Sequence, residues 1–213
     1  MTEVDTINVT WTVSFNSGGV DMPKLLEKIT YEDLYTFDNF DVDRRNRFAY
    51  LAAKDVANTP DTPYNPLFFY GNRYDGKTHL LKAMGNHIQS VNPEFNVVYA
   101  RAEDFYYEYL YEIRNSAMHL PKSFREKYRN ADVLLLDDID YLTGKNNFSK
   151  NYKNILGELN TPVEEFFHTF ETLYNRGKRI VLAANRQPKD LGDLDEMFGK
   201  RLEMGLVIGM RAG

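Results

Sequence analysis

The feature that most constrains the fold is an alternation of short apolar runs with longer segments of helical pattern. It starts after Tyr64 and takes in five runs. These are PLFFY (66–70), NVVYA (96–100), DVLLLDD (132–138), RIVLAA (179–184) and GLVIGM (205–210). Four of the runs are almost unbroken, as expected for strands covered on both faces, and the segments between them are long enough for crossover helices. The sequence therefore predicts an α/β fold in three layers, with helices on both faces of a five-stranded parallel sheet.

The length of the chain favours one domain. Its 213 residues, 43% of them apolar, are enough to bury one full core. Residues 1–33 match no motif, although 24–29 have the pattern of a short helix, so we expect an extension or linker there and one core over 34–213. No apolar run is long enough to span a membrane, and the first residues lack the pattern of a signal peptide. These features predict a cytoplasmic protein without a membrane span.

Charge and cysteine content exclude several kinds of site. The net charge of −5 argues against DNA binding over the whole surface, so a nucleic acid would need a local basic patch. The chain has no cysteine, which excludes disulfides and cysteine-ligated metals, and its four histidines do not have the spacing of a zinc motif.

A phosphate-binding pattern follows the first apolar run. Gly71, Gly76, Lys77 and Thr78 have the spacing G-x-x-x-x-G-K-T, between a strand and a helix, as this motif requires. The apolar side of that helix carries Leu80, Leu81, Met84 and Ile88. In such a loop, backbone N–H groups surround the phosphates, the lysine reaches the β and γ oxygens, and the threonine hydroxyl binds Mg²⁺. A chance match is the alternative for the loop taken alone.

Two carboxylates end the third apolar run. Asp137 and Asp138 stand at the carboxyl edge of a buried strand, where α/β sheets bind ligands. Asp137 is a candidate for the Mg²⁺ shell and Asp138 for polarising an attacking water. The alternative is an ordinary acidic turn after a strand. That alternative is reasonable for Asp140, but it explains Asp137 and Asp138 poorly when the phosphate loop is also present. The two motifs together predict a P-loop nucleotide fold.

Two further polar residues stand near strand ends. Asn185 follows the fourth run and is a candidate to sense the γ-phosphate or to orient the water, although turn residues of this kind are common there. Arg201 precedes the last run, where it is a candidate arginine finger for a neighbour's nucleotide; a surface salt bridge is the alternative.

Several segments together resemble the AAA+ domain of the bacterial chromosomal replication initiator, DnaA. They are YTFDNF (35–40), NRFAY (46–50), YNPLFFYG (64–71), GKTHLLKAMGN (76–86), FREKYRNADVLLLDDIDYL (124–142), EEFFHTFETLYNRGKRIVL (164–182) and RLEMGL (201–206). The resemblance implies an AAA+ ATPase that binds ATP or ADP with Mg²⁺, assembles head to tail on DNA and helps to open a replication origin. The implied partners are single-stranded and origin DNA, further copies of the chain or a full-length initiator, and a replicative helicase.

The resemblance also assigns roles to single residues. Asp137 and Asp138 take the Walker B positions, Asn185 the sensor-1 position and Arg201 that of the arginine finger. The positions that it implies for nucleotide binding are Val42, Asn46, Gly71, Asn72, Arg73, Tyr74, Asp75, Gly76, Lys77, Thr78 and His79. Thr78 and Asp137 are the implied Mg²⁺ ligands, and Val42 and Asn46 the implied adenine contacts.

Family members bind single-stranded DNA through a helical insertion that corresponds to residues 102–130. Leu110 best matches an apolar DNA contact there, and aromatic and basic side chains suit bases and phosphates. A helix that packs its apolar face is the alternative for Tyr106, Tyr109, Leu110 and Ile113, which have helical spacing. Lys145, Lys150 and Lys153 are further DNA-contact candidates.

Three departures from the family pattern qualify the resemblance. Tyr74 replaces a loop glycine where positive φ is common, at a cost of roughly 1–2 kcal/mol. If Asp75 faced the phosphates at about 5 Å, the repulsion would be roughly 3 kcal/mol, about a hundredfold in affinity, whereas a solvent-facing Asp75 would be screened. Residues 146–163 form an insertion, for which a DNA-facing or partner-facing surface and a solvated helix-turn are the alternatives. The 213 residues contain no counterpart of the family's lid or helix-turn-helix domain.

Three hypotheses follow. The first is a DnaA-type module that binds ATP, with slow or no hydrolysis by the chain alone. The second is a non-hydrolysing adaptor or regulator of the initiator, motivated by the altered loop. The third is a helicase loader of the DnaC class, against which the FDNF and EEFFHTF segments speak.

Overall fold

The computed structural model describes residues 34–59, 61–116, 119–143, 160–191 and 196–210. The expected extension over 1–33, with its short helix, lies outside the described residues. So do Lys145, Lys150, Lys153 and most of the 146–163 insertion.

Five parallel strands form one sheet, as the apolar runs predict. They are β1 (Leu67–Tyr70), β2 (Val97–Arg101), β3 (Val133–Asp137), β4 (Arg179–Ala184) and β5 (Leu206–Gly209). Their order across the sheet is β2-β3-β4-β1-β5, and every pairing is parallel. β1 therefore lies inside the sheet, between β4 and β5, and all strands end at the same edge.

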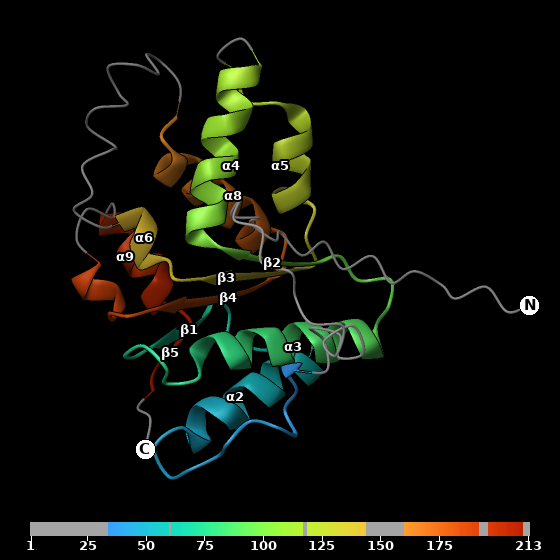
Figure 1. Cartoon of the computed structure of the whole chain (residues 1–213), viewed down its shortest axis with the longest axis vertical. Coiled ribbons are helices and arrows are strands. Elements are labelled where there is room, and N and C mark those ends of the chain that lie inside the picture. The colour runs from blue at the N-terminus through green and yellow to red at the C-terminus, as the bar shows by residue number, and fades with distance from the viewer. Residues whose placement is uncertain (1–33, 60, 117–118, 144–159, 192–195, 211–213) are drawn as a thin grey trace, which may run out of the picture.

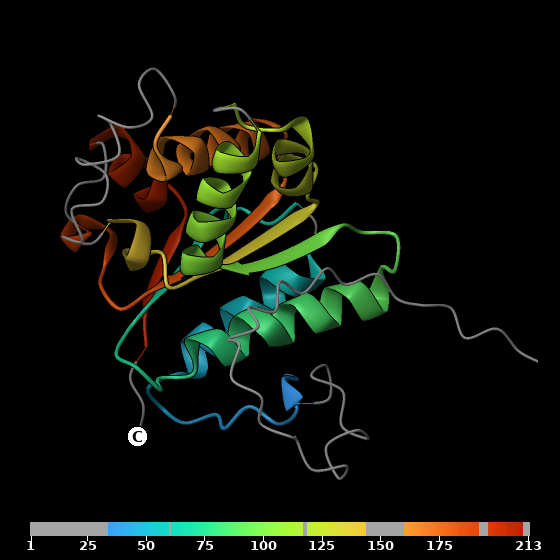
Figure 2. The ribbon, with the colours of Figure 1, turned by 45° about the horizontal axis from the view of Figure 1, so that its top comes forward.

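Helices cover both faces of the sheet, so the three-layer α/β prediction is confirmed (Figures 1 and 2). On one face lie α2 (Arg47–Asn58) and α3 (Lys77–Val91). On the other lie α4 (Ala102–Asn115), α5 (Lys122–Arg129) and α8 (Pro162–Asn175). The short α6 (Asp140–Thr143) and η2 (Pro188–Asp190), together with α9 (Glu196–Glu203), complete the described elements.

The sheet separates two apolar cores, because successive strand residues face opposite sides. Phe68 and Leu134 belong to the core under α4, α5 and α8, whereas Phe69 and Leu135 belong to the core under α2 and α3. The predicted apolar side of α3 is confirmed, since its four residues are fully buried in the second core. α3 is thus held rigidly beneath β1 and β3, whose ends carry the two predicted motifs.

The packing alternative holds for part of α4. Tyr109 and Ile113 are each only 1% exposed, and Leu110 packs half-buried beside them. Tyr107 and Tyr111, one turn apart, are 56% and 66% exposed. The helix therefore has a buried face and a separate, solvent-facing aromatic pair.

The end of the predicted insertion is the start of α8. The Thr161 side chain accepts a hydrogen bond from Glu164 N at 3.2 Å, and Glu164 Oε2 accepts one from Thr161 N at 2.6 Å. With Pro162 as the first helical residue, this capping box sets where α8 begins. Among the described residues, no helix is long and apolar enough to cross a membrane, and none of the His, Asp or Glu groups forms a metal-binding cluster.

Candidate functional site

The candidate site lies at the carboxyl ends of β1, β3 and β4. Gly71 follows β1, Asp138 follows β3 and Asn185 follows β4, so the parallel sheet brings these three positions to one edge. A cavity of about 330 Å³ opens there. The residues that line it are Tyr35, Arg73, Tyr74, Gly76, Lys77, Thr78, His79, Asp138 and Asn185. Six of these, from the loop and the start of α3, are predicted nucleotide-site residues, and Asp138 and Asn185 are predicted catalytic residues.

Two glycines shape the phosphate loop. A Cβ on Gly71 would lie 2.4 Å from Met210 O, so only glycine lets the loop leave β1 this close to the end of β5. Gly76 has φ +89° and a Cβ there would lie 2.7 Å from the Phe40 ring. Tyr74 also has positive φ, 69°, which confirms the expected strain at this position. Its ring is 91% exposed, so few contacts compensate that strain.

Asp75 does not point to solvent, which is one of the two orientations that the sequence left open. It is 5% exposed, and its Oδ2 accepts a hydrogen bond from Asn72 N at 2.6 Å, across the loop. The carboxylate therefore faces the loop interior rather than solvent. It also favours the charged form of Lys77. The solvent-facing alternative, in which screening removes the repulsion from the phosphates, is therefore wrong.

Lys77 is the buried cation of the site. Its Nζ donates hydrogen bonds to Gly71 O at 2.9 Å, to Asn72 O at 2.7 Å and to Asn185 Oδ1 at 3.3 Å. Burial lowers the pKa of the ammonium, and the carboxylates of Asp137 and Asp75 oppose that shift. These contacts hold the ammonium at the inner side of the loop, where phosphate oxygens can replace the neutral acceptors.

Thr78 and Asp137 come together as predicted for Mg²⁺ ligands. The Thr78 hydroxyl donates to Asp137 Oδ2 at 2.6 Å, although 59 residues separate the two in the sequence. Asp137 is 1% exposed, and burial raises its pKa while the Thr78 hydrogen bond opposes this. A hydroxyl and a carboxylate converging on one point are oxygen donors of the kind that Mg²⁺ prefers, so the residues present fit this ion.

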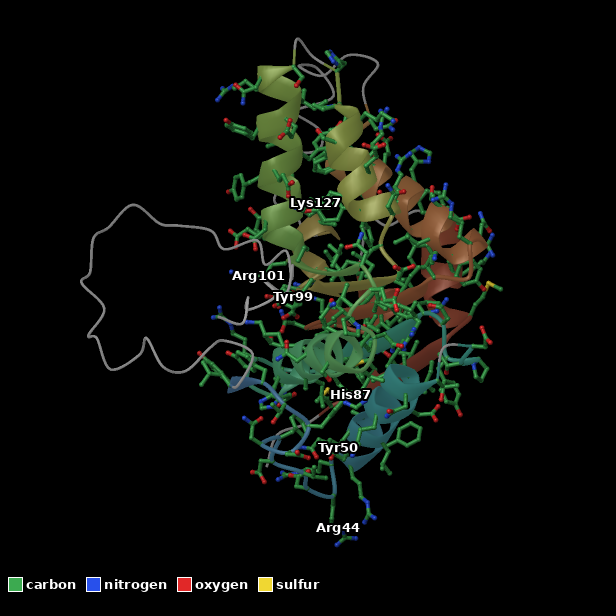
Figure 3. All side chains as sticks on the ribbon, turned by 90° about the vertical axis from the view of Figure 1, so that its right-hand side faces the viewer. Arg44, Tyr50, His87, Tyr99, Arg101 and Lys127 are labelled. Atoms are coloured by element: carbon green, nitrogen blue, oxygen red, sulfur yellow. The ribbon has the colours of Figure 1, made fainter. Side chains whose placement is uncertain are left out.

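Tyr99 is a site residue that the sequence analysis missed. Its hydroxyl donates to Asp137 Oδ2 at 3.2 Å, and burial raises the pKa of the phenol. Tyr99 lies in β2, next to β3 in the sheet, and Figure 3 shows it near Arg101 between α3 and α4. Its position in an apolar run marks it only as a core residue, and the strand register is what brings it to Asp137.

Asp138 has a strained backbone and a cationic neighbour. Its φ is 54°, and it lines the cavity beside Lys77. Arg101 Nη2 lies 3.6 Å from Asp138 Oδ2 and 3.4 Å from Glu103 Oε2. Arg101 ends β2 opposite Asp137 in the register, which explains its reach. Asp138 thus combines a strained backbone with a place on the cavity wall.

Asp140 orients the predicted sensor, so the reading of Asp140 as an ordinary acidic turn is too simple. Asp140 Oδ1 accepts from Asn185 N at 3.0 Å, and Asn185 Nδ2 lies 3.1 Å from Asp140 Oδ2. With its amide nitrogen held there, Asn185 presents Oδ1 to Lys77. The available signal was the spacing DDID, which places a third carboxylate one short turn after the first two.

The segment before α2 closes one side of the cavity. Tyr35 lines the cavity, and its ring packs edge-on against His79 at 5.3 Å between centroids. His79 Nε2 lies 2.9 Å from Thr36 O, and Lys82 Nζ lies 4.4 Å from the centre of the Tyr35 ring. The sequence places Tyr35 in a segment that resembles the family but does not predict that it lines the cavity.

Outside the phosphate loop and β3, four of the described residues with predicted functions are not among those that line the cavity. Asn46 is 7% exposed and binds its own loop, through Nδ2 to Asp41 O at 2.8 Å, while Val42 is 41% exposed nearby. Their adenine contacts stay a prediction. Leu110 lies on α4, and Arg201 lies on α9, where its Nε is 3.1 Å from Glu171 Oε1. The salt-bridge alternative for Arg201 therefore describes its contact within this chain.

The strain at Tyr74 leads to a measurable expectation. Because L-residues with positive φ cost about 1–2 kcal/mol and glycine does not, Tyr74→Gly should be more stable than Tyr74→Ala by about 1 kcal/mol. Both variants lose the exposed ring, so the alanine variant isolates the backbone effect. Urea unfolding followed by circular dichroism measures the difference. An alanine variant at least as stable as the glycine variant would refute the strain.

Comparison with known proteins identifies the family to which this chain is similar. The sequence profile of the bacterial DnaA ATPase domain matches residues 31–209. The chromosomal replication initiator protein DnaA of Nautilia profundicola is 45% identical over 177 residues, which are 83% of this chain and 36% of that protein. The chain thus spans little more than a third of the length of this relative.

Solved structures agree with the sequence match. Domain III of the DnaA protein of Thermotoga maritima is 37% identical with a TM-score of 0.71, over 83% of this chain and 67% of that one. A replication initiator DnaA bound to AMPPCP and single-stranded DNA is 33% identical with the same TM-score, over 84% and 50% of the two chains. A DnaC helicase loader, at 19% identity and a TM-score of 0.65 over 84% and 98%, shares the fold alone. Both the profile, which covers most of the chain, and the identity to the initiator proteins lead to one conclusion: the chain belongs to the bacterial DnaA ATPase domain family.

Proposed function

We propose that the chain is the nucleotide-binding part of a DnaA-like replication initiator and that it binds ATP or ADP with Mg²⁺. The observation that carries the proposal is the convergence of Lys77, Thr78, Asp137 and Asn185 at one cavity, from three separate segments of the chain. A relative 33% identical to this chain was solved with the ATP analogue AMPPCP, which supports the choice of nucleotide.

Each side chain has a distinct part in the proposed chemistry. Lys77 contacts the β and γ phosphate oxygens, while the N-terminus of α3 adds backbone donors to them. Thr78 and Asp137 hold Mg²⁺, which neutralises charge on the phosphates when it is bound. Asp138 accepts a proton from the attacking water, and Asn185, held by Asp140, orients that water. Hydrolysis by one chain alone is slow or absent, because a second copy supplies Arg201 to the nucleotide.

The proposal extends to nucleic acid and to assembly. Copies of the chain, or a full-length initiator, pack head to tail so that Arg201 of one meets the nucleotide of the next. The exposed pair Tyr107 and Tyr111 on α4 suits stacking on the bases of single-stranded DNA. A relative solved with single-stranded DNA supports this ligand. Origin DNA and a replicative helicase are further proposed partners, in the cytoplasm.

Titration with nucleotide tests the proposal directly. We expect isothermal titration to detect ATP and ADP binding in the presence of Mg²⁺, and weaker binding when EDTA removes the ion. GTP serves as the control for the base. Failure to bind either adenine nucleotide at millimolar concentration would overturn the proposal.

A second candidate is a non-hydrolysing adaptor that pairs with a full-length initiator. The strained and fully exposed Tyr74 in the phosphate loop favours it, because this residue replaces a glycine at the place where nucleotide must bind. ATP turnover by the purified chain, lost in Asp138→Asn, would rule the adaptor out. The helicase-loader alternative rests on fold alone, and co-purification with a replicative helicase but not with origin DNA would favour it.

A further inference from the structure

Arg201 is held by a set of contacts within its own chain. Its Nε lies 3.1 Å from Glu171 Oε1, and its guanidinium carbon lies 5.4 Å from the centre of the Tyr174 ring. Both partners are on α8, three residues apart, and therefore on the same face of that helix. Nη1 lies 3.6 Å from Met204 Sδ. The side chain of Arg201 is nevertheless 31% exposed, so these contacts hold it without enclosing it.

The two α8 side chains are held in different ways. Glu171 Oε1 is buried and accepts no hydrogen bond among the described residues, so the ion pair with Arg201 is the contact that offsets its burial. The Tyr174 ring stacks on the ring of the fully buried Phe170, at 5.8 Å between centroids and 13° between planes. The core thus holds the Tyr174 ring, and the partly buried Glu171 carboxylate has Arg201 as its charge partner. We call these two side chains the seat of Arg201.

The seat engages particular parts of the guanidinium. Glu171 lies against the Nε atom, and the guanidinium carbon lies over the Tyr174 ring. The Met204 thioether sulfur that Nη1 contacts is a weak acceptor, and Nη2 donates no hydrogen bond within the described part of the chain. The terminal nitrogens are thus those that can take phosphate oxygens, which bind guanidinium groups in a forked geometry.

We propose that Glu171 and Tyr174 are positioning residues, which hold Arg201 ready for the nucleotide of a second copy of this chain. This proposal rests on the proposed function, because it takes the neighbour's nucleotide as the target of Arg201. An arginine side chain loses rotamer entropy when it is fixed, so contacts that already hold it lower the cost of placing it. A partly exposed ion pair contributes little to stability, so positioning is the larger effect.

Complementation between two inactive variants isolates the role of Glu171. In Arg201→Ala the nucleotide site is intact, and in Lys77→Ala the arginine is intact. A mixture of the two therefore forms interfaces with one complete site, and we expect it to regain ATP turnover that neither variant has alone. Adding Glu171→Gln to the Lys77→Ala chain should lower this turnover roughly tenfold in kcat, with KM for ATP unchanged.

The matched control places the same substitution on the other chain. Glu171→Gln added to Arg201→Ala should leave the turnover unchanged, because that chain supplies no arginine. Tyr174→Phe, which keeps the ring, should behave as the parent, whereas Tyr174→Leu on the Lys77→Ala chain should lower kcat. Equal effects of Glu171→Gln on both chains, or none on either, would overturn the positioning role.

A second measurement does not depend on turnover. Because the Glu171 carboxylate beside Nε repels the hydroxide that catalyses exchange, the Nε–H proton of Arg201 should exchange with water at least about tenfold more slowly in the unmodified chain than in Glu171→Gln, as followed by NMR of the arginine Nε–H resonances. If the mixture of Lys77→Ala and Arg201→Ala stays inactive while this protection is observed, the hypothesis that Arg201 acts on the nucleotide of a second copy is refuted. The contacts of Arg201 with Glu171 and Tyr174 are then still supported. If Glu171→Gln leaves the exchange rate unchanged, the seat itself is refuted.

Discussion

Replacing Lys77 with alanine is expected to weaken ATP binding by at least about a hundredfold. The Nζ atom lies at the inner side of the phosphate loop, in contact with Gly71 O, Asn72 O and Asn185 Oδ1. An ammonium about 4 Å from a phosphate oxygen is stabilised by about 4 kcal/mol at an effective dielectric of about 20. Isothermal titration of both proteins with ATP and Mg²⁺ measures the difference in Kd.

A control with the same change in charge separates this contact from general electrostatics. Lys122 is on α5, on the opposite face of the sheet, and its side chain is 87% exposed. Lys122→Ala should leave Kd for ATP within about twofold, because salt screens a charge so far from the site. A Lys77→Ala protein that is folded by circular dichroism and binds ATP as the unmodified chain does would remove Lys77 from the site.

Replacing Glu165 with alanine is expected to lower the free energy of unfolding by about 3 kcal/mol. Glu165 is fully buried on α8 and forms an ion pair with Arg129, while Arg125 Nε lies 3.9 Å from the same carboxylate oxygen. Loss of the carboxylate leaves a largely buried guanidinium without its charge partner, which costs more than the pair itself contributes. Urea unfolding gives the free energy.

The exposed pair on α5 is the matched control for this effect. Glu126 lies 2.9 Å from Lys122, with side chains that are 49% and 87% exposed. Glu126→Ala should therefore change stability by no more than about 0.5 kcal/mol. A loss in Glu165→Ala as small as that of Glu126→Ala would show that the buried carboxylate does not hold α5 to α8.

Apolar patterning was sufficient to predict the sheet. Strands covered on both faces leave long apolar runs, and parallel strands need helices between them, so the two signals reinforce each other. β4 begins and ends where the run RIVLAA predicts. The ends of the other four strands differ from the ends of their apolar runs by no more than one residue. The pairing of Thr78 with Asp137 also follows from sequence, because strand ends share one edge of a parallel sheet.

Side-chain direction was the part that the sequence did not predict. Tyr99 has the pattern of a core residue, yet the strand register places its hydroxyl on Asp137. Asp140 resembles a turn residue, yet it binds both the backbone and the side chain of Asn185. Asp75 turns into its own loop because the backbone N–H of Asn72 lies beyond the end of β1, where no strand supplies an acceptor, and the Asp75 carboxylate accepts its hydrogen bond. Each of these side-chain directions depends on neighbours that are distant in sequence or on the local direction of the backbone. The spacing of residues in the sequence contains neither kind of information.

The division of the interior into two cores has a consequence for how such a chain can change over time. α4, α5 and α8 pack on one face and α2 and α3 on the other, with the sheet between them. Substitutions in separate cores rarely share partners, so their effects on stability add instead of compounding. Drift in the layer that carries Tyr107 and Tyr111 therefore places little demand on the layer that supports the phosphate loop. A lineage can therefore alter the aromatic face of α4 while the phosphate loop and its supporting core stay unchanged.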